Sequence, residues 1–336
     1  MGVKNTMAVT VSGAFAEFIR DKVNLETEKT KIARNSRDNL IDNIKNFSGE
    51  SDFFEIYAER ILRFGSFERR TKIRPIDDID LMICLSGEGK RTYIEEGNNI
   101  YINGCEEDSK NGLMTVGTNY LNSTKVINRF ISKLSCLRDY SKSEMHKNYE
   151  AATLKLKSYT WNFDIVPCFY TDKNLYLIPD GFGNWKITDP RIDNERTTRI
   201  NQKHNGKLLD MIRLVKYWNN RKVTVKINSY LLECMILDWY ESVDALAKWW
   251  VDLQFASVME YLSSAILLRV NDPKGIQGDI NTLKWEDRCK ISSALKNASQ
   301  KAKEAIGHEV RDGNTKEAIA KWRQVFGNDF PEYTGE

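Results

Sequence analysis

The sequence predicts an α+β fold in which a mixed β-sheet flanked by helices is followed by a helical lobe. Three observations support this: helical periodicity in residues 13–47, segments rich in β-branched and aromatic residues within 53–169, and helical periodicity in nearly everything from residue 207 onward. A chain of 336 residues can build a sizeable core in two lobes, which we expect at 1–205 and 206–336.

The N-terminal helical region is expected to consist of two helices. Its apolar residues recur at helical spacing: Phe15, Phe18, Ile19, Ile32, Leu40, Ile44 and Phe47. The stretch 23–25 is expected to separate the two helices.

Strands and turns are expected to follow. The four segments with strand-like composition are 55–64, 79–85, 152–157 and 161–169. A further hairpin is expected to join 174–178 to 185–188, with Gly181 and Gly183 in its turn. The polar, Gly- and Asn-rich segment 88–117 is expected to be an insertion or long loop.

Helices are expected in most of the remaining chain. One is predicted within 118–137, and the others are predicted at 207–220, 228–242, 245–268, 284–306 and 315–326. The Asn-Asp-Pro-Lys-Gly sequence at 271–275 interrupts this helical region.

Composition excludes several classes of protein. The net charge of +3 is too small for a typical nucleic-acid-binding domain, so any strong positive field must be local. Six cysteines without a CxxC pair, and three histidines, offer no zinc-binding spacing and indicate reduced thiols in the cytoplasm. No apolar stretch reaches the roughly 18 residues that a membrane span needs.

Asp78 and Asp80 lie in a segment that is otherwise apolar. Side chains at i and i+2 of a strand share a face, which places these carboxylates about 6–7 Å apart while Ile79 and Leu81 bury on the other face. A divalent cation such as Mg²⁺ would relieve the repulsion between them. The alternative is a solvated acidic turn, since Asp-x-Asp is common.

Gly65 and Ser66 precede these acids at the end of a predicted strand. Glycine allows the backbone to approach a phosphate closely, and the following amides and hydroxyl can donate hydrogen bonds to it. Four basic residues in the connection would add positive charge, or would form a solvated basic loop: Arg69, Arg70, Lys72 and Arg74.

Asp164 lies in the aromatic and aliphatic segment Trp161–Pro167. A carboxylate in such a strand is costly unless it is paired or binds a metal. A position on an edge strand or at a helix N-cap would satisfy it. A third metal ligand on an adjacent strand explains it better, because three carboxylates can hold two Mg²⁺ ions for phosphoryl or nucleotidyl transfer.

Together these motifs resemble the polymerase-β-type nucleotidyltransferase superfamily. More narrowly, the chain resembles the bacterial cGAS/DncV-like nucleotidyltransferases, which make cyclic oligonucleotide signals, over roughly residues 30–331. The narrower resemblance rests on motifs that follow the family's order: Ile178-Pro179-Asp180, the segment around Trp185, Arg213–Trp218, Ser229–Glu233 and Lys321–Gly327.

The resemblance implies a bilobal polymerase-β-like core with an N-terminal spine helix and an oligoadenylate-synthetase-C-like helical lobe. It implies that Asp78 and Asp80 bind two Mg²⁺ ions, with Mn²⁺ as the alternative metal, and that Asp164 completes the site. Gly65 and Ser66 would hold the donor triphosphate.

Three residues of the helical lobe are also implied in nucleotide binding. Lys216 and Ser229 resemble residues that contact the triphosphate, and Tyr230 resembles an aromatic residue that stacks on a base. A lysine is a suitable point charge for phosphate. The alternatives are that Lys216 is an ordinary exposed helix lysine and that Tyr230 is a core residue.

The function implied is a cytoplasmic, monomeric cyclic di- or trinucleotide synthase in anti-phage signalling. It would use nucleoside triphosphates and activate a separate effector protein, without a membrane or an obligatory nucleic acid. The zinc-binding insertion of animal cyclic GMP-AMP synthase is absent, which argues against activation by double-stranded DNA. The alternatives are a linear, template-independent polymerase (a 2′–5′ oligoadenylate synthase or an RNA 3′-end transferase) and a catalytically silent nucleotide sensor.

Overall fold

The protein is described here by a computed structural model that covers most of the chain. The described residues are 8–97, 99–221, 225–245 and 247–335. Within the described residues, no helix is both long enough and apolar enough to cross a membrane.

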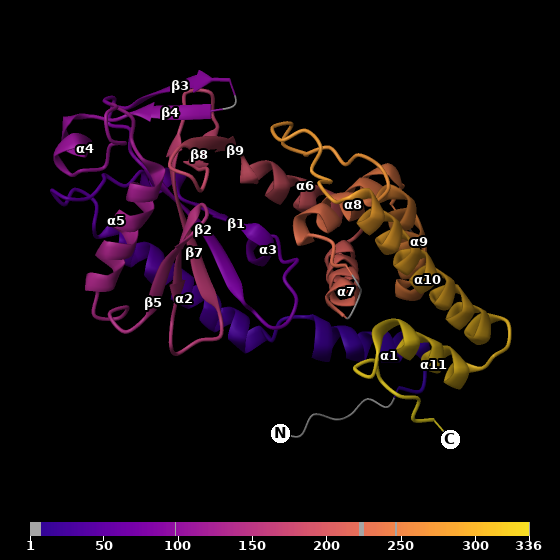
Figure 1. Cartoon of the computed structure of the whole chain (residues 1–336). Coiled ribbons are helices and arrows are strands. Elements are labelled where there is room, and N and C mark those ends of the chain that lie inside the picture. Colours follow the sequence, from indigo (N-terminus) through magenta and orange to yellow (C-terminus); the bar gives the residue numbers. More distant parts are fainter. Residues whose placement is uncertain (1–7, 98, 222–224, 246, 336) are drawn as a thin grey trace. The chain divides into compact units, whose positions relative to one another are not determined.

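The chain forms two compact units (Figure 1). The sheet unit comprises Glu26–Arg70 and Pro75–Asn194, and the helical unit comprises the chain up to Leu25, Thr71–Arg74 and everything from Glu195 onward. One unit contains a mixed sheet with helices, and the described part of the other is mainly helical, which confirms the predicted α+β class. The expected division of the chain into one lobe at 1–205 and another at 206–336 remains a prediction.

A nine-stranded sheet forms the centre of the sheet unit. Its strands are β1 (Leu62–Phe64), β2 (Asp78–Leu85), β3 (Thr92–Glu96), β4 (Asn99–Asn103), β5 (Glu144–Asn148), β6 (Ala151–Lys155), β7 (Asn162–Tyr170), β8 (Tyr176–Pro179) and β9 (Trp185–Thr188). The strand order is β1-β2-β7-β8-β9-β4-β3, and β6 pairs with both β5 and β7. Strands β2 and β7 run parallel, whereas the other paired strands are antiparallel.

Helices of the sheet unit lie beside this sheet. They are α2 (Thr27–Lys45), α3 (Gly65–Glu68), α4 (Glu106–Lys110), α5 (Ser123–Cys136) and a 3₁₀ turn, η2 (Ala58–Arg60). Asn122 caps the N-terminus of α5, where its side chain accepts a hydrogen bond from the Lys125 amide, and the helix packs against β5, β6, β7 and β8. Its buried side chains recur at helical spacing, as an amphipathic helix on a sheet requires: Val126, Ile127, Phe130 and Leu134.

The prediction of a continuous strand over 55–64 is wrong. Only β1 and an isolated bridge between Ile56 and Leu85 pair with β2. The chain between Ile56 and Leu62 is longer than the facing stretch of β2, so the extra residues leave the sheet as η2. There the Arg60 guanidinium stacks on the Tyr170 ring, with 4.1 Å from its carbon to the ring centroid.

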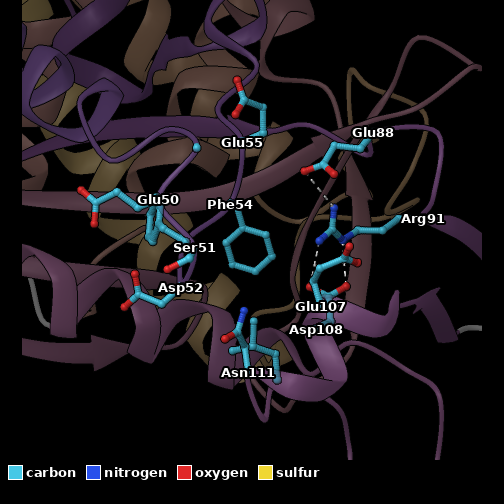
Figure 2. Close-up of a pocket in the computed structure, with 13 residues that line it drawn as sticks. Glu50, Ser51, Asp52, Phe54, Glu55, Glu88, Arg91, Glu107, Asp108 and Asn111 are labelled. Atoms are coloured by element: carbon cyan, nitrogen blue, oxygen red, sulfur yellow. Dashed lines mark hydrogen bonds and ion pairs between the residues drawn. The ribbon is translucent and has the colours of Figure 1, made fainter.

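The predicted long loop at 88–117 contains the β3–β4 hairpin and helix α4. Strand β4 buries Ile100 and Ile102, but the hairpin exposes polar residues on its other face, which is why its composition resembled a loop. A buried ion pair holds α4, with Arg91 donating to both carboxylate oxygens of Asp108 at 2.8 and 2.9 Å (Figure 2). This pair lines a polar pocket of about 200 Å³.

Among its described residues, the helical unit contains six complete α-helices and most of a seventh. They are α1 (Val11–Phe18), α7 (Leu208–Asn220), α8 (Ser229–Ser242), α9 (Val251–Ala265), α10 (Trp285–Val310), α11 (Thr315–Phe326) and, from Glu195, α6 (Pro190–Lys203). Helix α6 was not predicted, because its sequence is strongly polar. Aromatic packing joins α1 to α11, with the Phe15 and Trp322 ring centroids 4.7 Å apart.

Arg74 has a structural role in this unit. A π-helical turn, η1 (Ile19–Val23), follows α1, and the Arg74 guanidinium donates to the backbone carbonyls of Arg20, Asp21 and Asn24 at 2.8–3.3 Å. Carbonyls at the end of a helix lack partners within the helix, so these contacts stabilise its end. The guanidinium of Arg74 is therefore engaged in capping rather than lying in a solvated basic loop.

Candidate active site

Three carboxylates gather where β2 and β7 lie side by side. Asp80 and Asp164 are partners in the parallel register, and Asp78 lies two residues before Asp80 on the same strand. Side chains of registered residues in a sheet share a face, as do side chains at i and i+2. Each of the three half-buried residues therefore offers a carboxylate oxygen, and these oxygens lie within 4.8 Å of one another.

This arrangement fits a divalent metal ion. Carboxylates that are held this close repel one another unless a cation or a proton intervenes. Hard oxygen donors are the ligands that Mg²⁺ and Mn²⁺ prefer. The triad could therefore bind a metal as three ligands from two adjacent strands.

Asp77 is not part of this cluster. It precedes β2, is exposed, and its Oδ1 accepts a hydrogen bond from the Asp78 amide at 3.0 Å. Asp77 therefore lies outside the cluster, in the segment that leads into β2.

Gly65 lies against Asp80. The glycine follows β1, whose last residue Phe64 is paired with Asp80, and it begins α3 with a φ of +76°. A Cβ at this position would lie 1.8 Å from Asp80 Oδ2. Only glycine fits both the backbone conformation and the space. The structure thus places Gly65, and Ser66 after it, beside the carboxylates, while their contact with a triphosphate remains a prediction.

Thr153 contacts the cluster and was not recognised from the sequence. It lies on β6 opposite Asp164, is 4% exposed, and its hydroxyl donates to Asp164 Oδ1 at 2.6 Å. In the sequence Thr153 alternates with Leu154 and so falls on the polar face that also carries Lys155, and this pattern gave no signal that Thr153 is buried. The bond fixes the orientation of the Asp164 carboxylate.

We expect Thr153→Val to weaken metal binding. The substitution keeps the side-chain shape but removes the hydrogen bond, and loss of such a partner typically costs about 10- to 100-fold in metal affinity or activity. A Mg²⁺ titration of the reaction rate would show a higher half-saturating concentration for Thr153→Val and a nearly normal one for Thr153→Ser. An unchanged Mg²⁺ dependence in the valine variant would contradict the assigned role.

Lys216 is buried in the helical unit, so the alternative of an ordinary exposed helix lysine is wrong. It lies on α7, its side chain is 6% exposed, and its Nζ is 2.7 Å from Glu233 Oε1 on α8. The Glu233 side chain is 3% exposed. Glu233 lies one helical turn after Ser229, so Lys216 packs against the first turns of α8.

Lys216→Met should destabilise the protein strongly. Removal of one partner leaves the other charge buried, which costs about 3–5 kcal/mol in the free energy of unfolding. Urea denaturation would measure this loss. The double variant Lys216→Met/Glu233→Met should recover most of it, because replacing a whole buried pair with apolar residues is often neutral. Equal stability of the single and double variants would contradict this account.

Ser229 and Tyr230 begin helix α8. The N-cap residue Asn228 accepts hydrogen bonds from the Tyr230 and Leu231 amides at 2.9 and 3.4 Å. Ser229 is exposed, and Tyr230 is half-buried, with part of its ring against the helical core. Lys216 and these two residues thus belong to the helical unit, whereas the acids and Gly65 belong to the sheet unit. Their nucleotide contacts remain predictions.

Comparison with known proteins identifies the family. No protein-family model matches the chain. The chain is 44% identical over 336 residues to a probable cyclic nucleotide synthase of Bacillus cereus (strain VD146), covering 97% of this chain and 99% of the relative. The chain belongs to the bacterial cGAS/DncV-like nucleotidyltransferase family. It is therefore a nucleotidyltransferase, as its motifs suggested.

Solved structures support the fold of this nucleotidyltransferase. CdnC of E. coli MS115-1 with ATP matches with a TM-score of 0.69 at 15% identity, over 94% of this chain and 98% of that one. The DncV cyclic AMP-GMP synthase of Vibrio cholerae matches with a TM-score of 0.60 at 15% identity, over 82% of this chain and 70% of that one. These similarities confirm the polymerase-β-like fold.

Proposed function

We propose that this nucleotidyltransferase is a Mg²⁺-dependent synthase of a cyclic di- or trinucleotide. The observation that carries the proposal is the cluster of Asp78, Asp80 and Asp164 on adjacent strands, with Gly65 packed against it. A relative with 44% identity along nearly the whole chain, named as a probable cyclic nucleotide synthase, supports this choice of product.

In this proposal the three aspartates would hold two metal ions. When bound there, two Mg²⁺ ions would stabilise the attacking and leaving oxygens of an in-line displacement. A ribose 2′ or 3′ hydroxyl attacks the α-phosphorus of a second nucleotide, the bond to the β-phosphate breaks, and pyrophosphate leaves. Asp164 helps to accept the hydroxyl proton, and Thr153 holds its carboxylate in position. A second displacement within the linear product closes the ring.

The remaining predicted residues would bind the nucleotides. Gly65 and Ser66 would hold the donor triphosphate through the backbone and the hydroxyl, because glycine permits close approach. Lys216 and Ser229 would contact a triphosphate from the helical unit, and Tyr230 would stack on a base. The first turn of α8 carries partial positive charge that favours phosphate.

The proposal extends to the biological setting. A small cyclic product that diffuses from a cytoplasmic, monomeric enzyme would activate a separate effector protein in anti-phage defence. In this setting the enzyme would not require a bound nucleic acid. At the metal site, Mn²⁺ could replace Mg²⁺, because both are hard octahedral cations.

Product analysis tests the proposal. The protein is incubated with labelled ATP, GTP, CTP and UTP and Mg²⁺, treated with phosphatase, and the products are identified by mass spectrometry. Phosphatase-resistant cyclic product supports the proposal. Linear products alone would favour the template-independent polymerase, and nucleotide binding without Mg²⁺ dependence or pyrophosphate release would favour the silent sensor.

A further inference from the structure

A buried ion pair lies against Tyr230 in the loop that joins α9 to α10. The Asp272 and Lys274 side chains are 0% and 5% exposed, and Lys274 Nζ lies 2.9 Å from Asp272 Oδ1. Lysines are almost never fully buried unless they are paired. A buried pair in a connecting loop therefore indicates a role in addition to shaping the loop.

Asp272 organises this loop. Its carboxylate accepts hydrogen bonds from the backbone amides of Lys274, Ile276 and Gln277 at 3.0–3.2 Å. Burial acts to raise the pKa of Asp272, but Lys274 and the backbone donors outweigh it and lower the pKa. The carboxylate is thus held ionised and fixes the position of Lys274.

Lys274 in turn contacts Tyr230. Its ammonium lies 4.3 Å from the centroid of the Tyr230 ring and is hydrogen-bonded to the Tyr230 hydroxyl. The same hydroxyl is 3.3 Å from Asp272 Oδ1. The Tyr230 ring is therefore held at its hydroxyl end, by Lys274 and by Asp272.

We propose that Lys274, held by Asp272, is a positioning residue that orients the Tyr230 ring for stacking on a nucleobase. This inference rests on the proposed function, which gives Tyr230 a base to stack on. The fixed ring loses little conformational freedom when a nucleotide binds, so its orientation contributes to affinity.

The mechanism predicts an effect on binding rather than on chemistry. Stacking on an aromatic side chain contributes substantially to nucleotide affinity, so loss of the ammonium that holds the ring should raise KM for the nucleotide roughly tenfold. The kcat should change less than about twofold, since Lys274 is assigned no contact with the reacting atoms.

Lys274→Met tests this inference, with Lys173→Met as the matched control. Lys173 lies 5.7 Å from the Tyr93 ring centroid and 2.9 Å from Glu95, but its side chain is 61% exposed and it belongs to the sheet unit. KM, kcat and the Kd of a non-hydrolysable ATP analogue are measured for both variants, together with the melting temperature. We expect KM and Kd to rise together in Lys274→Met and to stay unchanged in Lys173→Met.

A double-mutant cycle separates positioning from a general structural effect. In a Tyr230→Leu background, Lys274→Met should add no further increase in KM, because the ring on which it acts is gone. Additive increases would overturn the inference. If Lys274→Met does not fold, Tyr230→Phe provides the test: it keeps the ring but removes the hydroxyl contacts, and KM should rise about two- to threefold. An unchanged KM there would count against positioning.

The outcomes distinguish this inference from the proposed function. A wild-type chain that forms product while Lys274→Met keeps normal KM and Kd overturns the inference alone. A wild-type chain that forms no product in any nucleotide mixture overturns the proposed function, and the inference with it.

Discussion

Asp78→Asn is expected to reduce pyrophosphate release from nucleoside triphosphates by about a thousandfold or more. Asparagine preserves the side-chain shape but removes one of three charges within a 4.8 Å cluster. Stabilisation of the reacting oxygens by bound metal contributes several kcal/mol, which corresponds to a rate factor of this size. A coupled pyrophosphate assay at saturating Mg²⁺ measures the loss. The melting temperature is measured alongside, so that a loss of folding is distinguished from a loss of rate.

Asp77→Asn is the matched control. It removes the same charge from the neighbouring residue, and the asparagine oxygen can still accept the hydrogen bond from the Asp78 amide. Its rate should remain within about twofold of wild type, since substitutions at exposed positions are usually mild. Comparable losses in the two variants would show that local negative charge, and not a metal site, explains the effect.

Gly65→Ala is expected to lower kcat by about 100-fold or more. The new Cβ would lie 1.8 Å from Asp80 Oδ2, so either the carboxylate or the start of α3 must move. Displacement of a catalytic group by about 1 Å can cost this much. The positive φ of +76° should also reduce stability by about 1–2 kcal/mol. Steady-state kinetics and thermal unfolding measure the two effects separately.

Gly89→Ala separates strain from displacement. Gly89 has a similar φ of +66°, but a Cβ there would have nothing within 4 Å. This variant should lose a similar amount of stability and keep its rate. If both alanine variants lost activity equally, backbone strain alone would account for the effect and the close approach to Asp80 would be unimportant.

Much of the site could be predicted because strand geometry is local. A period of two is enough to place Asp78 and Asp80 on one face, and Asp164 is conspicuous as a carboxylate in an apolar strand. The register that places Asp164 opposite Asp80, and Thr153 opposite Asp164, is set by strand pairing between distant parts of the chain. Thr153 was missed for that reason.

The same contrast between local sequence pattern and long-range packing explains which parts of the fold could be predicted. Helical periodicity predicted α7, α8, α10 and α11 closely, whereas the polar α6 carried little of that signal. The burial of Lys216 depends on how α7 and α8 pack, and the spacing of residues within α7 cannot reveal it. Periodicity therefore indicates where helices lie, but not which of their charges are buried.

The parallel pairing of β2 and β7 has a consequence during synthesis. Asp78 and Asp80 leave the ribosome well before Asp164, and a nascent chain that ends ahead of β7 cannot assemble the carboxylate cluster. Parallel neighbours need a long crossover, so their contact forms only after the intervening chain has been made. The metal ligands therefore come together only in a chain that is complete through β7.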